Sequence, residues 1–260
     1  MRDQDYTLSE LMSIVASRML TNDDVCFVGI GLPSEAANLA RLTHAPDIKL
    51  IYESGTLVTR PDVLPLSIGD GELSDTALSV VSVPEMFRYW LQGGKIKVGF
   101  LGAAQIDKFA NLNTTSIGDY KSPKVRLPGA GGAPEIASHA AKVFITLKHS
   151  TKAFVEKLDF ITSVGFLEGG DSRDKLNLPG SGPQMVITDL GILEPDPITK
   201  ELVLTHVHPG VTVEQIKEAT GWNLLVADSV KRTEPPTDKE LEVLRDIKLR
   251  TKIANSGAAK

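Results

Sequence analysis

The stretch IKLIYESGTLV, residues 48–58, is the feature of this chain that most constrains its fold. Its apolar first half, residues 48–52, predicts a buried strand of a parallel sheet that leads directly into Glu53. Gly55 tolerates a positive φ and therefore allows a tight exit from this strand. In open α/β sheets, ligands bind in the crevice outside the carboxyl ends of the strands. Glu53 is therefore either a functional carboxylate at a strand tip or, as residue type alone favours, a solvated loop acid.

Composition limits the class of protein. The 260 residues suffice for a large core, either as one α/β domain or as two closely packed lobes, and we assign residues 1–260 to a single domain. The net charge of −5 argues against a nucleic-acid partner, because phosphates require a basic face. No segment reaches the roughly 20 apolar residues of a membrane span, so no membrane association is expected. Cys26, the only cysteine, predicts a buried thiol, and we expect a cytoplasmic protein.

Helix and strand signals alternate along the chain. This pattern predicts an α/β fold with an open, mostly parallel sheet flanked by helices. A capping box of Thr7 and Glu10 begins the first expected helix, prolines and glycines mark other helix ends, and short apolar runs mark the strands. The expected helices cover residues 7–20, 33–42, 84–91 and 212–220, with a last helix from residue 237; the expected strands cover residues 25–30, 48–52, 97–101 and 142–148. Residues 59–76 are rich in Pro, Gly and Asp and predict a loop. Residues 184–189 and 201–207 predict a hairpin closed by the turn PDPITK.

Two glycine-rich loops suggest a nucleotide site, but both depart from the known patterns. GIGLPSE, residues 29–35, has two glycines of a dinucleotide fingerprint, with Ser34 in place of the third. GAGGAPEIA, residues 129–137, lacks the Lys and Ser/Thr of a phosphate-binding P-loop. The second loop can still donate backbone N–H groups to a thioester or an anion, or it is only a turn.

Further polar groups have two interpretations each. His206 and His208 share one face of a strand and could chelate a metal, but no third ligand is evident nearby. A packing or hydrogen-bonding role is favoured, and no metal is expected. The segment NLNTTSIGDY, residues 111–120, follows a strand and either lines a site or satisfies its own turns.

Three blocks carry a resemblance to a known family. IYESGTLV, LGAAQIDKFANLNTTSIGDY and LPGAGGAPEIA together resemble the B subunits of class I coenzyme A transferases of the glutaconate CoA-transferase type. LPLSIGDGEL, FITSVG and LPGSGP are similar to the 3-oxoadipate CoA-transferase B subunits of aromatic catabolism. Transferases of the ketoacid type carry SENG where this chain has YESG, but the glutamate is retained. The resemblance covers nearly the whole chain and implies the CoA-transferase (NagB/RpiA-like) fold.

The resemblance also implies a chemistry and a set of site residues. Glu53 would be the catalytic nucleophile that attacks an acyl-CoA thioester and then carries CoA as a glutamyl thioester. Backbone N–H groups at Gly102 and Ala103 would stabilise the oxyanion, and Gly131 and Gly132 would frame the CoA side of the site. CoA thioester is a substrate in this chemistry, so no permanently bound cofactor is expected.

Substrates and partner follow from the same resemblance. It implies succinyl-CoA as donor, 3-oxoadipate as acceptor, and an A subunit that completes a hetero-oligomer. Arg60, Lys121 and Arg126 are candidates to bind the remote carboxylate of the acid, although residue type alone favours solvated surface charges. The alternatives are glutaconate or another dicarboxylate as acceptor, an acyl-CoA hydrolase or decarboxylase on the same fold, and a non-catalytic binding module. The last leaves Glu53 and the two glycine-rich loops unexplained.

Overall fold

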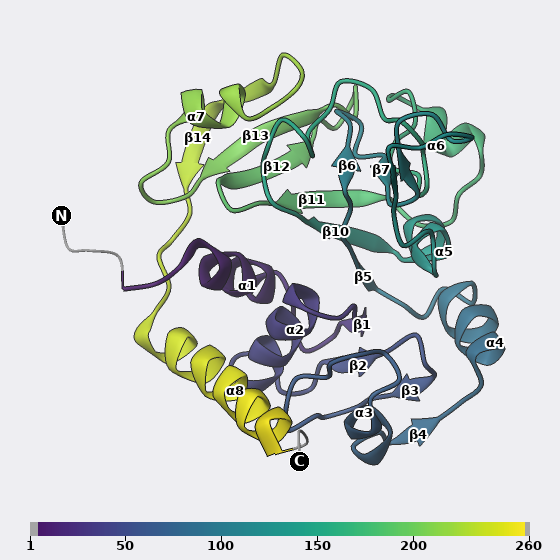
Figure 1. Cartoon of the computed structure of the whole chain (residues 1–260), viewed down its shortest axis with the longest axis vertical. Helices are drawn as coiled ribbons and strands as arrows, with labels where there is room; N and C mark the ends of the chain where they lie inside the picture. The colour runs from purple at the N-terminus through teal and green to yellow at the C-terminus, as the bar shows by residue number, and fades with distance from the viewer. Residues whose placement is uncertain (1–4, 258–260) are drawn as a thin grey trace. The chain divides into compact units, whose positions relative to one another are not determined.

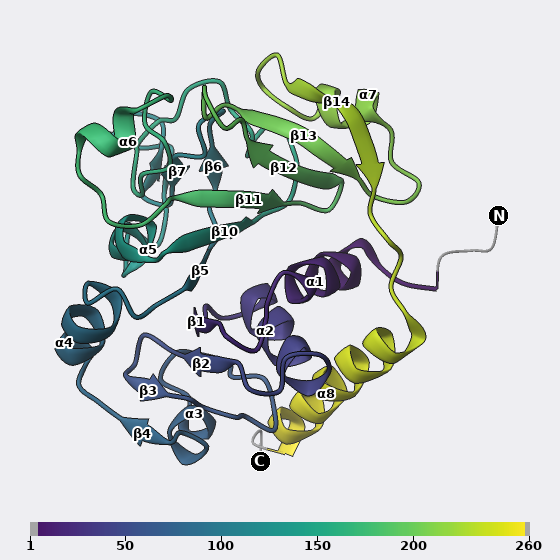
Figure 2. The same cartoon turned by 180° about the vertical axis from the view of Figure 1, so that it is seen from behind.

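The computed structural model describes residues 5–257, and Figures 1 and 2 show it from opposite sides. The chain divides into two compact units. Unit 1 comprises Met1–Val98 and Pro235–Lys260, and unit 2 comprises Gly99–Glu234. The assignment of residues 1–260 to a single domain stays a prediction.

Unit 1 contains a sheet that begins parallel and ends antiparallel. β1 (Val25–Phe27) pairs in parallel with β2 (Lys49–Ile51). β3 (Thr56–Leu57) and β4 (Ser79–Val80) then add antiparallel, which gives the order β1-β2-β3-β4. The predicted buried strand at residues 48–52 is confirmed as β2, and the chain reverses direction directly after it.

Three helices of unit 1 pack together. α1 (Leu8–Arg18), α2 (Leu32–Leu42) and α8 (Asp238–Gly257) lie side by side in both views. The predicted capping box begins α1, and its Glu10 also accepts a 2.7 Å hydrogen bond from Arg245 Nε of α8. The bond to Arg245 lowers the pKa of Glu10 to about 2, so this ion pair joins the first and last helices at neutral pH. Their shared core comprises Ile14, Leu39, Leu241 and Leu244.

The connection that follows β3 contains more structure than the sequence indicated. Residues 59–76 were expected to be a loop but include α3 (Gly71–Asp75), whose first turn is capped by the Asp70 carboxylate. The expected helix at residues 84–91 begins as α4 (Val83–Glu85) and continues as a π-helix, η1 (Met86–Leu91). Short polar caps of this kind stabilise brief helices that apolar periodicity alone does not reveal.

Unit 2 holds the strands that follow β5 (Val98–Leu101). β10 (Lys142–Thr146) pairs in parallel with β11 (Pro183–Ile187). β13 (Leu202–Val207) pairs in parallel with β14 (Leu225–Arg232). The strand order through these elements is β14-β13-β12-β11-β10.

The predicted hairpin of residues 184–189 with 201–207 is wrong. β12 (Gly191–Pro195) lies between β11 and β13 and is antiparallel to both. The turn at residues 196–200 closes β12 onto β13, with Asp196 Oδ1 accepting from Thr199 N at 2.7 Å. The α/β class with an open sheet flanked by helices is confirmed, and its mostly parallel pairing is interrupted by β3, β4 and β12.

The remaining elements of unit 2 are short. The strand pairs are β6 (Gln105–Ile106) with β7 (Leu112–Asn113) and β8 (Ser116–Ile117) with β9 (Val125–Arg126); the helices are α5 (Ala133–His139), α6 (Ser172–Lys175) and α7 (Val213–Glu218). Only α7 corresponds to a predicted helix, that of residues 212–220. Among the described residues, no helix is both long enough and apolar enough to cross a membrane.

Arg173 is a buried cation that fixes several loops of unit 2. Its guanidinium donates to Gly180 O at 2.8 Å, to Gly165 O at 3.0 Å and to Ala137 O at 2.7 Å. Carbonyl acceptors satisfy the desolvated N–H groups, which makes burial of this charge tolerable. The side chain thus ties the end of α5 to two separate glycine turns.

Candidate active site

Glu53 lies in the tight turn that joins β2 to β3. The carbonyl of Tyr52 accepts a 3.0 Å hydrogen bond from Gly55 N, which closes a four-residue turn with Glu53 and Ser54 at its corners. The Glu53 side chain is half-buried, and within residues 5–257 no hydrogen bond or ion pair holds its carboxylate. The predicted position of Glu53, directly beyond a buried strand, is confirmed.

Gly55 is required by the geometry of this turn. Its φ is 101°, a conformation that residues with a side chain rarely adopt. A Cβ at this position would also collide with the carbonyl oxygen of Val81, whose N–H donates to Gly55 O at 2.9 Å. The turn that carries Glu53 is therefore packed directly against the residue that follows β4.

A buried polar network anchors the residue before Glu53. Tyr52 is fully buried, and its hydroxyl lies 2.9 Å from Ser34 Oγ in the first turn of α2. Asn38 Nδ2 donates to Ser34 O at 3.0 Å, and Arg41 Nε donates to Asn38 Oδ1 at 3.2 Å. Burial raises the pKa of Tyr52 to about 12, so the phenol stays neutral. Ser34, which interrupts the dinucleotide fingerprint, thus fixes the strand that delivers Glu53, a role that sequence reasoning missed.

Tyr52→Phe is expected to lower the free energy of unfolding by about 1 kcal/mol, because Ser34 loses a buried hydrogen-bond partner while the ring still fills its space. Chemical denaturation of both proteins measures the difference. Tyr89→Phe is the matched control, since Tyr89 is 59% exposed. Equal stability of Tyr52→Phe and the wild type would contradict the anchoring role.

The strand exit at Gly102 and Ala103 lies at the carboxyl end of β5, as predicted. Ala104 N donates to Asn113 O at 3.0 Å, which fixes the chain just after the exit. Within the described part of the chain, the N–H groups of Gly102 and Ala103 have no acceptor. Two main-chain donors are therefore available to a ligand at this strand tip.

The second glycine-rich loop lies beside this exit. Gly131 has a φ of 51°, and Gly132 is the residue before α5. The expected loop of residues 129–137 is therefore half helix, because α5 begins at Ala133. Thr114 Oγ donates to Gly129 O at 2.8 Å, and Thr114 directly follows the residue that binds Ala104. The consecutive residues Asn113 and Thr114 thus contact the strand exit and the glycine-rich loop, respectively.

Arg60 lies at the opposite end of β2 from Glu53. Its guanidinium is exposed and donates to Pro46 O at 3.3 Å, before the amino end of β2. Glu53 follows the carboxyl end of the same strand. This geometry gives Arg60 a structural contact, and its binding to a substrate carboxylate stays a prediction.

Lys121 and Arg126 belong to the β8–β9 hairpin of unit 2. Lys121 is exposed, and its backbone N–H donates to Asp119 Oδ1 at 2.9 Å. The Arg126 guanidinium lies 5.1 Å from the centre of the Tyr120 ring and donates to Tyr120 O at 3.2 Å. Asp119 and Tyr120 therefore shape the hairpin, and substrate roles for the two cations stay predictions.

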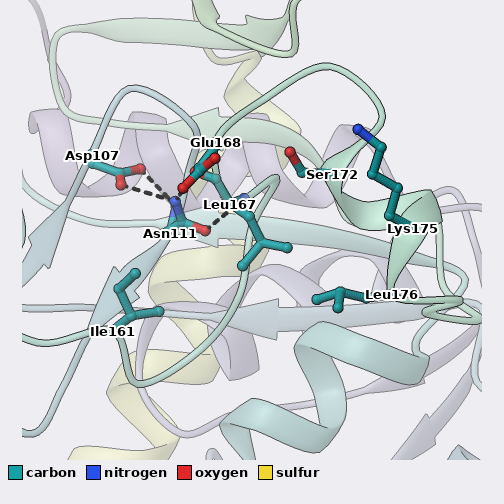
Figure 3. Close-up of a pocket in the computed structure, with 8 residues that line it drawn as sticks. All are labelled: Asp107, Asn111, Ile161, Leu167, Glu168, Ser172, Lys175 and Leu176. Atoms are coloured by element: carbon teal, nitrogen blue, oxygen red, sulfur yellow. Dashed lines mark hydrogen bonds between the residues drawn. The ribbon is translucent and has the colours of Figure 1, made fainter.

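Asn111 borders a pocket of about 410 Å³ in unit 2 (Figure 3). Its Nδ2 donates to Asp107 Oδ2 at 2.9 Å, while its Oδ1 accepts from Leu167 N at 3.0 Å. Burial raises the pKa of Asp107. These bonds favour the interpretation that Asn111 satisfies its own loop. The lining residues are Asp107, Asn111, Ile161, Leu167, Glu168, Ser172, Lys175 and Leu176; of these, only Asn111 belongs to a segment that the sequence offered as a candidate site.

His206, in β13, and His208, directly after it, each make hydrogen bonds with other residues of unit 2. His208 is buried, with Nδ1 at 2.9 Å from Thr233 Oγ1 and Nε2 at 2.8 Å from Thr188 O, and burial lowers its pKa. His206 Nδ1 lies 3.0 Å from Thr205 Oγ1. Across residues 5–257, no three His, Cys, Asp or Glu side chains gather as metal ligands would. The hydrogen-bonding interpretation is confirmed, and the absence of a bound metal stays a prediction.

These features are typical of an α/β enzyme: unit 1 presents a carboxylate that pairs with no described residue, and unit 2 presents main-chain donors, each at the carboxyl end of a strand. The profile of the coenzyme A transferase family matches residues 10–219, and the chain belongs to that family. It is 61% identical over 250 residues to the B subunit of 3-oxoadipate CoA-transferase from Pseudomonas knackmussii, covering 96% of both chains. It is 36% identical over 247 residues to the B subunit of glutaconate CoA-transferase from Acidaminococcus fermentans, covering 93% of this chain and 92% of the relative.

The solved structures agree with the sequence matches. The crystal structure of glutaconate coenzyme A-transferase from Acidaminococcus fermentans superposes with a TM-score of 0.88 at 34% identity, covering 94% of this chain and 95% of that one. The family resemblance and the fold inferred from the sequence are therefore confirmed. The chain is the B subunit of a CoA-transferase.

Proposed function

We propose that this chain acts with an A subunit to move CoA from succinyl-CoA to 3-oxoadipate, with Glu53 as the nucleophile. The 61% identity to the B subunit of a 3-oxoadipate CoA-transferase, over 96% of both chains, is the observation that carries the substrate assignment. The Glu53 carboxylate, which pairs with none of the described residues and lies in a strand-end turn, supports the catalytic assignment. CoA enters and leaves as a substrate, so the reaction needs no resident cofactor.

The proposed reaction begins at the donor thioester. A Glu53 carboxylate oxygen attacks the acyl carbon of succinyl-CoA, and the carbon–sulfur bond breaks to give an acyl-glutamyl anhydride and CoA thiolate. The thiolate then attacks the side-chain carbonyl carbon of Glu53, which forms a glutamyl-CoA thioester and expels succinate. A carboxylate of 3-oxoadipate attacks this thioester, and the same two steps in reverse release 3-oxoadipyl-CoA and restore Glu53.

A carboxylate is a weak nucleophile, so its placement must contribute much of the rate. The Gly55 turn and the buried hydroxyl of Tyr52 hold the backbone of Glu53 in one position. Each attack also places negative charge on a carbonyl oxygen, which requires preorganised donors. We assign this role to the N–H groups of Gly102 and Ala103, whose lack of an acceptor in the described chain supports it.

CoA binding requires cationic groups for the CoA diphosphate, and we assign part of this site to the A subunit. The proposed wall on the CoA side is the loop with Gly131 and Gly132, which offers main-chain groups and no cation. The chain has a net charge of −5 and no evident cluster of Lys and Arg for a diphosphate. The 3-oxoadipate and glutaconate relatives are themselves B subunits. An A subunit that supplies part of the CoA site in a hetero-oligomer fits these observations, and a cytoplasmic location stays a prediction.

A panel of acceptor acids tests the substrate assignment. With the assembled enzyme and succinyl-CoA, kcat/KM for 3-oxoadipate should exceed that for acetoacetate by about two orders of magnitude or more. The reason is that an acid without the second carboxylate leaves polar groups of the site unpaired. Lys121→Ala and Arg126→Ala should narrow this ratio if either cation binds the remote carboxylate.

The same panel separates the alternatives. A higher kcat/KM for glutaconate than for 3-oxoadipate would overturn the substrate assignment but not the family assignment. The 36% identity to a glutaconate CoA-transferase chain is consistent with that outcome. Loss of succinyl-CoA without any acceptor acid would indicate a hydrolase and would overturn the transfer mechanism.

A further inference from the structure

Lys148 is an exposed cation just beyond the carboxyl end of β10. Its two neighbours in the chain, Leu147 and His149, are both buried, and each is only 7% exposed. Within residues 5–257, no hydrogen bond, ion pair or aromatic contact engages the Lys148 ammonium group. Most exposed lysines are only solvated, but Lys148 differs from these in what lies beside it.

The chain around Lys148 runs beside the strand exit that begins at Gly102. A Cβ on Gly102 would lie 3.5 Å from the carbonyl oxygen of Thr146, just before Lys148. Beyond Lys148, Ala153 O accepts a 2.7 Å hydrogen bond from Ile106 N, which follows the same exit. Lys148 therefore lies between two points at which these segments of unit 2 touch. Gly102 is itself exposed, so the exit is open to a ligand.

His149 fixes the backbone next to Lys148. Its ring stacks on Phe154 with 3.7 Å between the ring centres, and its Nε2 lies 2.9 Å from Thr220 Oγ1. Its backbone N–H donates to Asp189 Oδ1 at 2.7 Å. Burial lowers the pKa of His149 to about 4, so the ring is neutral at pH 7 and the positive charge at this position belongs to Lys148.

The donors at this strand exit suit two functional groups of a single acyl compound. The N–H groups of Gly102 and Ala103 suit a carbonyl oxygen on which negative charge develops. An ammonium group suits a carboxylate, which needs a charged or multiply hydrogen-bonded partner once it is desolvated. A dicarboxylic acid carries both groups on one short carbon chain, whereas a monocarboxylic acid carries only the first.

We infer that Lys148 binds the remote carboxylate of a dicarboxylic substrate whose reacting carbonyl lies at Gly102 and Ala103. This inference rests on the proposed function, and it assigns the selectivity for dicarboxylates to one residue. The Arg126 guanidinium already contacts the ring and the carbonyl of Tyr120, whereas the Lys148 ammonium makes no contact within the described chain.

Removal of the Lys148 charge tests the inference with two acceptor acids. In the complex with the A subunit, Lys148→Gln should lower kcat/KM for 3-oxoadipate by about 30-fold and leave kcat/KM for acetoacetate within about twofold. In a ping-pong reaction, kcat/KM for the acceptor does not depend on the donor half-reaction, so succinyl-CoA serves as the donor throughout. Lys152→Gln is the matched control, because Lys152 is an exposed lysine of the same loop, and it should leave both values within about twofold.

Lys148→Arg gives a second readout. It retains the charge and should keep the preference for 3-oxoadipate within about fivefold of the wild type, whereas a purely structural role would not separate Arg from Gln in this ratio. The Tm of each variant should equal that of the wild type. An unchanged ratio of the two kcat/KM values in Lys148→Gln would overturn the inference.

Two other outcomes are distinguishable from these. An equal loss for both acids in Lys148→Gln would overturn the inference and assign the Lys148 charge to the CoA phosphates. A wild-type enzyme without a preference for 3-oxoadipate would overturn the proposed substrate, and the inference with it.

Discussion

Glu53→Ala is expected to lower kcat for CoA transfer by about four orders of magnitude or more, because the variant has no group that can form the anhydride or the glutamyl-CoA thioester. Its free energy of unfolding should stay within about 0.5 kcal/mol of the wild type, since the Glu53 carboxylate makes no hydrogen bond or ion pair within the described chain. Transferase assays and chemical denaturation on the same preparations measure the two quantities.

Two control variants test whether the loss of transferase activity is caused by the loss of the Glu53 carboxylate. Glu53→Gln keeps the size of the side chain and should be as inactive as Glu53→Ala, since an amide is a poor nucleophile. Glu218→Ala removes an exposed acid at the end of α7 and should keep full activity. A wild-type kcat for Glu53→Ala would contradict the catalytic role and would support the alternative that Glu53 is a solvated loop acid.

The isolated chain is expected to transfer CoA at least about 100-fold more slowly than its complex with the A subunit. The acidic chain has no evident site for the CoA phosphates, and an incomplete crevice cannot exclude the water that would hydrolyse an anhydride. Titrating the A subunit into a fixed amount of this chain, with CoA transfer as the readout, should give activity that saturates at a fixed ratio of the two chains. Wild-type turnover by the isolated chain would contradict a two-subunit site.

Local patterns predicted the features of the fold that depend on residues close in the sequence. The buried strand β2, the tight exit at Gly55 and the capping box at Glu10 each follow from a few neighbouring side chains, and the structure confirms all three. The buried thiol of Cys26 is confirmed as well, because an apolar run around a lone cysteine is typical of a core strand. Strand pairing is not local in this sense, so the two apolar runs around β12 were joined into the wrong hairpin.

Within the candidate site, too, the sequence predicts only the features that depend on residues close together in the chain. The positions of Glu53 and of the strand exit at Gly102 follow from apolar runs that predict strands and from the small residues that come after them. The contact of Tyr52 with Ser34 joins residues that are 18 positions apart, and no local pattern encodes it. No local pattern predicts the burial of Arg173, since arginines are mostly exposed; its burial depends on three carbonyl groups that are distant in the sequence.

Mass spectrometry of the reaction intermediate tests the central claim, that Glu53 itself carries CoA. The assembled enzyme is mixed with succinyl-CoA in the absence of an acceptor acid, and the mass of each intact chain is recorded before and after borohydride reduction. The account predicts that this chain gains the mass of one CoA less one water, and that reduction converts the Glu53 carboxyl group to an alcohol in the peptide that contains residues 48–58. Full transferase activity with no CoA on this chain, or with CoA attached to a different residue, would contradict the account.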